Sequence, residues 1–165
     1  VAFGALKVRG PWVANGYYGL SDVPGDEDCP VDEKGWFQTG DVASITPEGY
    51  LQITDRTKDV IKSGGEWISS IEIENAAVNH PDIAEAAVIG RYHPKWTERP
   101  LLIVVSQEGK SLTAEDVLAF LKDKLHKMAM PDDVVFIEEL PHTATGKINK
   151  LGLRETYEDY KFPAE

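Results

Sequence analysis

The stretch "SSIEIENAAVNHPDIAEAAVIGRYH", residues 69–93, decides the fold of most of the chain. Ser69 is followed three residues later by Glu72, which is the pattern of a capping box, and Pro81 closes the segment. A helix is therefore predicted from Ser69 onward. The run that follows, residues 83–93, is largely apolar and predicts a buried strand. A helix directly followed by such a strand indicates a domain in which helices pack on a sheet.

The segments toward the C-terminus extend this pattern. Residues 99–108 predict a second buried strand, and residues 113–125 predict a helix with Thr113 as its N-cap. Residues 133–139 predict a third strand and residues 150–159 a short last helix. The order helix, strand, strand, helix, strand predicts a small α+β domain with helices on a roughly three-stranded sheet.

The segments upstream of residue 69 are richer in turns and strands. Two strand-like runs flank Pro47–Gly49, and a second pair flanks Gly64–Gly65, so both are predicted to be hairpins. Six of the twelve residues in Asp22–Glu33 are acidic, which indicates an exposed loop. The pattern changes near Asp55–Asp59. We therefore predict a β-rich first part, 1–55, and a separate domain, 56–165.

Composition and charge limit the possible functions. The chain has 165 residues, of which 42% are hydrophobic, enough to build a packed core. A formal net charge of −11 argues against nucleic acid as a partner, because that binding needs a basic face, but it leaves room for a small anion. The lone Cys29 cannot form an intrachain disulfide. The longest aliphatic run, residues 101–105, is far too short to cross a membrane.

The stretch "PHTATGKINK", residues 141–150, contains a glycine–lysine pair that resembles the end of a phosphate-binding loop. Such a loop needs a glycine five residues before the pair and a hydroxyl residue after it. Pro141 and Ile148 occupy these positions, so the interpretation as a phosphate-binding loop fails. What remains is a short loop of small and hydroxyl residues that bends tightly and holds Lys147 away from the domain. Taken alone, Lys147 is a solvated surface lysine or a cation for a phosphate oxygen.

The stretch "IKSGGEWIS", residues 61–69, combines three features that suit a nucleotide or a pantetheine. Adjacent glycines let the backbone approach a ligand and expose its N–H groups. Lys62 supplies a cation before them and Trp67 an aromatic plane after them. The alternative is a hairpin turn with a core tryptophan.

Two further motifs carry charged candidates. In "GWFQTGD", Asp41 follows a glycine and can accept the two hydroxyls of a ribose, or it is an ordinary turn aspartate. In "DRTKD", Arg56 and Lys58 place two cations at the predicted boundary, or they form a solvated charge run. The four histidines show no metal-ligand spacing, so no metal site is assigned.

Taken together and in order, these motifs resemble a known family. The stretches "GWFQTGD", "DRTKDVIKSGGEWISSIEIEN", "HPDIAEAAVIG" and "LPHTATGKINK" are similar to the C-terminal part of the adenylate-forming superfamily. "IKSGGEWIS" and "HPKWTERPL" look most like fatty-acyl-CoA ligases. The resemblance implies an AMP-forming acid–thiol ligase. Such an enzyme converts a carboxylic acid and ATP to an acyl-adenylate, and coenzyme A then displaces AMP.

The resemblance also implies residue roles. Lys147 matches the catalytic lysine of adenylation, which stabilises charge at the α-phosphate. Asp41 matches the aspartate that holds the ribose, Arg56 matches an arginine at the nucleotide, and Lys58 matches the hinge residue, also at the ATP/AMP site. The coenzyme A face is implied for Lys62, Ser63, Gly64, Gly65, Glu66 and Trp67. Lys62 and Trp67 are also implied at the nucleotide, because the C-terminal domain of the family rotates between the two steps.

The family's ATP loop and acyl pocket, which lie in a large N-terminal domain, are not found in these residues. We therefore expect residues 1–55 to be the tail of that domain and the fragment to be inactive alone. ATP with Mg²⁺ bound in the large domain, coenzyme A and a medium- or long-chain fatty acid are the expected partners. A cytoplasmic location follows from the resemblance, with membrane association or a homodimer left to the full-length enzyme. The alternatives are an adenylating enzyme that uses a carrier protein, and a stand-alone binding module.

Overall fold

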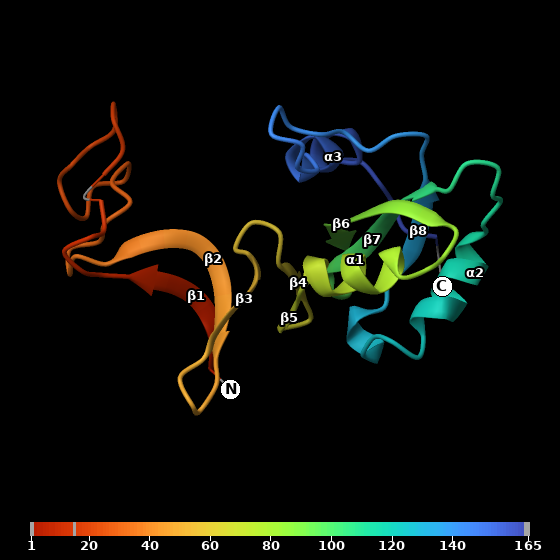
Figure 1. The fold of residues 1–165 in the computed structure, drawn as a ribbon, viewed down its shortest axis with the longest axis horizontal. Helices are drawn as coiled ribbons and strands as arrows, with labels where there is room; N and C mark the ends of the chain where they lie inside the picture. Colours follow the sequence, from red (N-terminus) through yellow and green to blue (C-terminus); the bar gives the residue numbers. More distant parts are fainter. Residues whose placement is uncertain (1, 15, 164–165) are drawn as a thin grey trace. The chain divides into compact units, whose positions relative to one another are not determined.

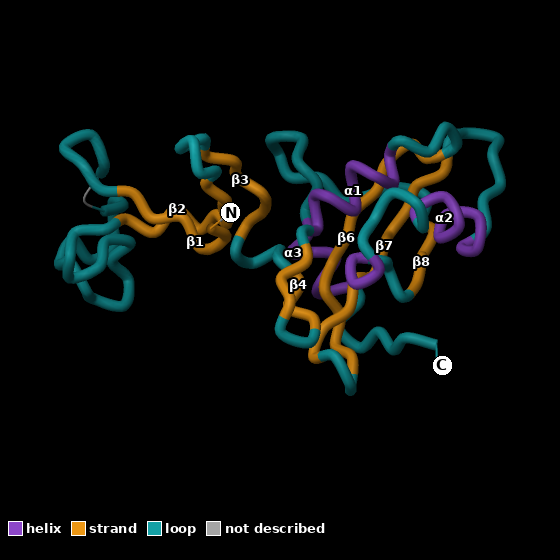
Figure 2. The backbone as a smooth tube through the Cα atoms, turned by 90° about the horizontal axis from the view of Figure 1, so that it is seen from below, coloured by secondary structure: helices purple, strands orange, loops and turns teal. Residues whose placement is uncertain are grey.

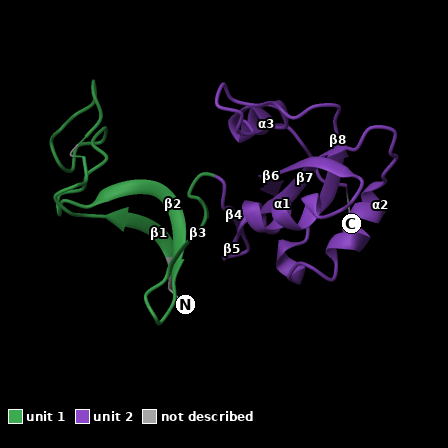
Figure 3. Ribbon diagram, viewed as in Figure 1, with its two compact units in different colours: residues 1–58 green, residues 59–165 purple. Residues whose placement is uncertain are grey.

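Residues 2–14 and 16–163 are described in a computed structural model, where they fall into two units, 1–58 and 59–165 (Figure 3). The division lies at the end of the boundary segment predicted from the sequence, three residues beyond residue 55. Lys58 is the last residue of the first unit. Asp59 opens the second unit, where its carboxylate accepts a hydrogen bond from Arg154 Nη1 at 2.6 Å.

The first unit is a three-stranded antiparallel sheet in the order β1-β2-β3 (Figure 1). Its strands are β1 (Ala2–Val8), β2 (Phe37–Ile45) and β3 (Leu51–Arg56). The predicted hairpin between β2 and β3 is confirmed, with a turn closed by a hydrogen bond from Gly49 N to the Thr46 carbonyl. The acidic segment between β1 and β2 forms successive turns and is mostly exposed, as predicted.

The apolar core of this first unit is small. Val31, Val42 and Ala43 are its buried hydrophobic residues within the described part of the chain. Ile45, Leu51 and Ile53 stay about half exposed on the strands, although isoleucine and leucine favour burial. No described helix lies in this unit. Its sheet therefore leaves an apolar surface that its own residues do not cover.

The second unit contains the helices and a five-stranded sheet (Figure 1). Its strands are β4 (Ile61–Ser63), β5 (Glu66–Ile68), β6 (Ile83–His93), β7 (Thr97–Ser106) and β8 (Asp133–Phe136). Its helices are α1 (Ser70–Val78), α2 (Ala114–Leu121), the 3₁₀ helix η1 (Lys127–Ala129) and α3 (Lys150–Thr156).

The predicted helix starts are confirmed by their caps. The Ser69 side chain accepts a hydrogen bond from the Glu72 backbone N–H at 3.2 Å and begins α1. Thr113 and Asp116 form a complete capping box at the start of α2. These reciprocal bonds with the Thr113 side chain and backbone lower the pKa of the Asp116 carboxyl, because they favour its charged form. The helix α2 ends at Leu121, four residues before the predicted end.

The roughly three strands and the β4–β5 hairpin that were predicted for the second unit are all present, and they join in one sheet (Figure 2). Its order is β5-β4-β7-β6, with β8 also paired to β7. The hairpin attaches through a single antiparallel pair, Ser63 with Thr97, whereas β8 pairs in parallel with residues 101–104 of β7. The strand β7 therefore changes partners from β4 to β8 near Arg99.

Both faces of this sheet are buried. On one face α1 and α2 pack Ile73, Ala77, Val117 and Leu121 over the sheet. On the other face Leu153 of α3 packs with Ala87, Ile89, Leu101 and Ile103. Successive side chains along the apolar runs that were predicted as buried strands therefore point alternately into two cores. The α+β fold class is confirmed, with helices on both faces.

Candidate functional site

The glycine pair at residues 64 and 65 closes the β4–β5 hairpin. Both glycines have positive φ, 57° and 92°, as a type I′ turn requires. The pairing places Lys62 directly opposite Trp67. Side chains at such positions share one face of a hairpin, and both are exposed here, Trp67 by 42%. The hairpin therefore presents a cation, an aromatic plane and a turn without side chains together.

Three side chains of this hairpin are buried. Ile61 and Ile68 are buried in the core, which fixes the face on which Lys62 and Trp67 lie. Ser63 is also buried, and its hydroxyl accepts a hydrogen bond from Arg99 Nη1 at 3.2 Å. The side chain of Ser63 thus supports the turn from inside. Glu66 and the two glycines are exposed.

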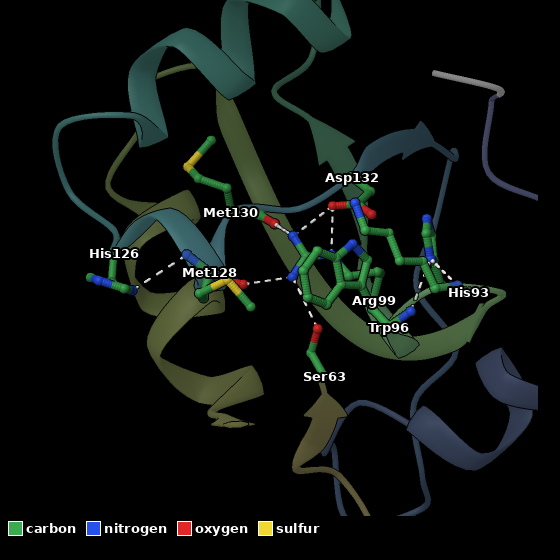
Figure 4. Close-up of polar contacts among 9 residues, drawn as sticks. Ser63, His93, Trp96, Arg99, His126, Met128, Met130 and Asp132 are labelled. Carbon is green, nitrogen blue, oxygen red and sulfur yellow. Dashed lines mark hydrogen bonds and ion pairs between the residues drawn. The ribbon is translucent and has the colours of Figure 1, made fainter. Parts of the chain in front are cut away.

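A pocket of about 280 Å³ lies beside Trp67. The far side of the pocket is formed by His126, Met128 and Ala129 of the η1 segment. His126 Nδ1 accepts a hydrogen bond from the Met128 backbone N–H at 3.3 Å and so caps η1 (Figure 4). The pocket has apolar and polar lining next to the exposed tryptophan, which suits a ligand with both apolar and polar groups.

Arg99 is a buried residue that the sequence interpretation missed. Its guanidinium donates to Asp132 Oδ1 at 2.8 Å, to the carbonyls of Met128 and Met130 at 2.8 Å, and to the Ser63 hydroxyl (Figure 4). A buried arginine is stable only when its donors are satisfied in this way. An arginine heading the apolar run of residues 100–105 was the signal that could have identified it.

Lys147 lies in a loop that is closed by its own backbone. The Lys147 carbonyl accepts a hydrogen bond from Thr143 N at 2.7 Å, and Gly146 N donates to the Thr143 carbonyl at 2.9 Å. His142 and Ile148 form a β-bridge at its base. The side chain of Lys147 is exposed, and within residues 16–163 no acceptor is paired with its Nζ. The loop therefore holds the backbone and leaves the cation available.

The next lysine along the chain, Lys150, behaves differently. Its Nζ donates to the Ser70 hydroxyl and contacts Glu74 Oε1, both at 2.8 Å. The Glu74 carboxylate also accepts a hydrogen bond from the Val88 backbone N–H at 2.7 Å. Both charged side chains are more than four-fifths buried. Lys150 thus connects α3 to α1 and β6, and this role is structural.

Asp41 and Arg56 lie opposite each other on β2 and β3. Arg56 Nε and Asp41 Oδ1 are 3.3 Å apart, and the arginine side chain is 65% exposed. Lys58 follows two residues later and is exposed at the unit boundary. Of the predicted residues, the structure pairs Asp41 with Arg56 and gathers residues 62–67 on one hairpin. Among the described residues no hydrogen bond or ion pair joins Lys147 to that hairpin.

The described residues contain neither a cluster of metal-ligating side chains nor a membrane-spanning helix. No group of three or more histidine, cysteine, aspartate or glutamate side chains lies together in a way that could hold a metal ion. None of the helices in that part of the chain has the length and apolar content to cross a membrane. His142 Nε2 lies 3.0 Å from Glu85 Oε1 and ties the base of the Lys147 loop to β6.

Comparison with known proteins finds a known domain and similar enzymes. Residues 72–147 match the AMP-binding enzyme C-terminal domain. The chain is 53% identical over 156 residues to a 3-methylmercaptopropionyl-CoA ligase of Ruegeria pomeroyi, covering 94% of this chain and 28% of that protein. It is 46% identical over 159 residues to a long-chain-fatty-acid–CoA ligase of Thermus thermophilus, covering 96% of this chain and 29% of that protein.

The solved structures agree with this result. The ATP-bound crystal structure of MatB from Rhodopseudomonas palustris matches with a TM-score of 0.84 and 35% identity, covering 97% of this chain and 31% of that one. The chain thus spans less than a third of the length of these relatives. Family and fold agree with the resemblance inferred from the motifs. Residues 72–147 therefore form the C-terminal domain of the AMP-binding enzymes, and the relatives that match more than nine-tenths of the chain are acyl-CoA ligases.

Proposed function

We propose that this chain is the C-terminal part of an enzyme that activates a carboxylic acid with ATP and transfers the acyl group to coenzyme A. The observation that carries the proposal is the environment of Lys147. A lysine held on a hydrogen-bonded loop, with its Nζ unpaired within the described residues, is ready to approach an anion. Lys150, three residues away, is paired with Glu74 and cannot take this role.

In the first step, negative charge concentrates where the acid carboxylate meets the α-phosphate of ATP. A cation placed there in advance stabilises the transition state more than the separate reactants, and this difference accelerates the step. We assign this role to Lys147. The other nucleotide contacts are assigned to Asp41 for the ribose hydroxyls and to Arg56 for the phosphate side. The 3.3 Å contact between these two side chains supports the pairing, because it orients the carboxylate from one side.

In the second step, the thiol of coenzyme A attacks the acyl-adenylate and AMP leaves. We assign the β4–β5 hairpin to this step, with residues 62–67 facing the pantetheine. The exposed turn lets the ligand approach the backbone, and Lys62 and Trp67 offer a cation and a stacking plane beside it. We further propose that Lys58 is the hinge, since it is exposed and ends the first unit. Lys62 and Trp67 would then contact the nucleotide in one state and coenzyme A in the other.

The first unit fits the role of a tail of a large N-terminal domain. Its sheet leaves Ile45, Leu51 and Ile53 about half exposed, which a larger domain would cover. We propose that the ATP loop, the Mg²⁺ that accompanies ATP, and the acyl pocket belong to that domain. The 165-residue chain alone should therefore release no pyrophosphate from ATP and a fatty acid. Detectable release by the purified chain would contradict this part of the proposal.

The identity of the carboxylic acid is a separate proposal. Relatives of similar identity include ligases named for 3-methylmercaptopropionate and for long-chain fatty acids. We propose a medium- or long-chain fatty acid, on the resemblance of "HPKWTERPL" to fatty-acyl-CoA ligases. The test compares kcat/KM of the full-length enzyme for 3-methylmercaptopropionate, octanoate and palmitate. A preference for the short thioether acid would overturn the fatty-acid assignment while leaving the reaction type intact.

The test of the reaction itself uses the full-length enzyme and its Lys147→Ala variant. Pyrophosphate release from ATP and acid should fall by about 100-fold or more in the variant. Thioester formation from supplied acyl-adenylate and coenzyme A should change by no more than about twofold. The control is Lys161→Ala, which removes another exposed lysine near the C-terminus. Transfer to a phosphopantetheinylated carrier protein in preference to coenzyme A would contradict the proposed acceptor.

A further inference from the structure

We propose that the tip of the β6–β7 hairpin, residues 93–99 and hereafter the β6–β7 tip, positions the 62–65 turn for the thioester step. Trp96, Glu98 and Arg99 would be positioning residues that act on coenzyme A through the turn. The claim that the turn binds coenzyme A rests on the proposed function. The claim that the β6–β7 tip fixes the position of the turn does not depend on that function and can be tested by itself.

The turn needs such support because its strands are short. β4 has three residues and β5 has three, and β4 joins the sheet through the single pair of Ser63 with Thr97. An isolated two-stranded hairpin is marginally stable in water. The position of the turn therefore depends on contacts other than the strand ladder.

Trp96 supplies the contact at the turn itself. The Trp96 carbonyl accepts a hydrogen bond from Gly64 N at 2.8 Å. The indole lies so close that a Cβ atom added at Gly64 would be 2.7 Å from Trp96 Cε3. Glycine is required at position 64 both for its positive φ and for this close approach. The ring thus forms a wall against one side of the turn.

Glu98 and Arg99 hold the two residues before the glycine pair. Glu98 Oε2 accepts a hydrogen bond from the Lys62 backbone N–H at 2.8 Å. Arg99 Nη1 donates to the Ser63 hydroxyl, and the same guanidinium binds Asp132 (Figure 4). Lys62, Ser63 and Gly64 are therefore each held by a different residue of the β6–β7 tip.

The β6–β7 tip is itself held in an unusual backbone conformation. Thr97 has φ of 73°, the only positive φ outside glycine within the described residues. A β-branched residue rarely adopts this region, and such strain persists where the surroundings enforce it, often at functional sites. His93 Nδ1 accepts hydrogen bonds from the backbone N–H groups of Lys95 and Trp96 and stabilises the bend (Figure 4).

The structural half of the proposal is tested on the 165-residue chain by amide hydrogen exchange. In Trp96→Ala, the amides of residues 62–65 should exchange about tenfold faster than in the wild type. Trp96→Phe, which keeps an aromatic wall, should restore most of the protection. Tyr92→Ala is the matched control, because it removes an exposed aromatic ring from the same hairpin. Unchanged exchange in Trp96→Ala would overturn the proposal, whatever the enzyme's reaction.

The functional half is tested in the full-length enzyme with the same three variants. Trp96→Ala should raise the KM for coenzyme A about tenfold. The rate of acyl-adenylate formation should stay within about twofold of the wild type, because the Lys62 backbone, whose side chain is also assigned to the nucleotide, keeps its hydrogen bond to Glu98. Equal loss in both steps would show a general structural role and overturn the positioning role. A wild-type enzyme that forms acyl-adenylate but no thioester with coenzyme A would instead refute the proposed function, and the exchange result would still decide the hold on the turn.

Discussion

The Lys147 loop and the 62–65 turn are fixed in contrasting ways. Within the Lys147 loop the backbone bonds itself, through Thr143, Gly146 and Lys147. Among the hydrogen bonds of the described residues in this loop, only that of His142 at its base reaches another strand. The turn is held by residues more than 30 positions away, on the β6–β7 tip. One element is thus locally determined, and the other depends on tertiary contacts.

This difference has a functional consequence. If the loop serves adenylation and the turn serves thioester formation, distant substitutions on β7 should affect the second step and spare the first. A locally closed loop tolerates changes elsewhere in the domain, because its geometry is encoded in its own sequence. Four sets of substitutions test how these local and tertiary contacts contribute.

The largest effect is expected for Arg99→Met, which removes the central support of the turn. Asp132 and Ser63 would lose their donor, and two carbonyls would be left without a partner. Breaking a buried ion pair in this way should lower the free energy of unfolding by about 3 kcal/mol, measured by urea denaturation. The control is Arg56→Met, whose ion pair is exposed and should contribute less than about 1 kcal/mol. Equal losses would contradict the structural role of Arg99.

The next effect compares two glycines, one in each element. Gly64→Ala should cost about 1 kcal/mol for its positive φ plus about 1 kcal/mol or more for the clash with Trp96. Gly146→Ala, with φ of 78° and no atom within 4 Å of the new methyl, should cost only the contribution of about 1 kcal/mol that comes from the positive φ. Combined with Trp96→Ala, the Gly64→Ala variant should lose less unfolding free energy than the sum of the two single variants, whereas the loss for Gly146→Ala should be additive. Additive losses for both pairs would show that Trp96 does not clash with a methyl group at position 64.

The third effect separates two neighbouring lysines. Lys150→Met should lower the free energy of unfolding by about 2 kcal/mol, because Glu74 loses a buried partner. Lys147→Met should leave stability within about 0.5 kcal/mol, because its side chain is exposed. Thermal unfolding of the two variants measures the contrast. A destabilised Lys147→Met would show that the loop lysine is structural.

The smallest effect depends on pH. The Tyr160 hydroxyl donates to Asp133 Oδ2 at 2.5 Å, and burial followed by this hydrogen bond raises the pKa of Tyr160. Because the pKa of Tyr160 is raised in the folded state, the stabilisation of that state by this hydrogen bond is complete below the unfolded pKa of about 10. It is lost as pH rises through the folded pKa. Tyr160→Phe should therefore cost about 1 kcal/mol at pH 7 and show a shallower decline above about pH 10. If the free energy of unfolding fell with pH in the same way for the wild type and for Tyr160→Phe, ionisation of Tyr160 would not contribute to the loss of stability.

Much of the fold could be predicted from local patterns. Ser69 and Thr113 marked helix starts, because capping depends on residues three positions apart. Gly64–Gly65 marked a hairpin, because both positions need positive φ. The tight loop around Lys147 was predicted for the same reason, since the bonds that close it lie within a few residues.

What escaped prediction depends on contacts between distant segments. Nothing near Ser63 in the sequence indicates that Arg99 binds its hydroxyl, or that the β4–β5 hairpin joins the main sheet through Thr97. The difference between Lys147 and Lys150 was equally hidden, because the partner Glu74 lies on α1. Burial and pairing decide these roles, and both follow from tertiary packing rather than spacing.

The most direct test measures both half-reactions in full-length Lys147→Ala and Trp96→Ala, side by side. The proposal predicts a crossover. Lys147→Ala should lose acyl-adenylate formation by about 100-fold and keep thioester formation, whereas Trp96→Ala should keep adenylate formation and need about tenfold more coenzyme A. If both variants instead lost the same step, or each lost both steps equally, the assignment of the loop and the turn to separate steps would be contradicted.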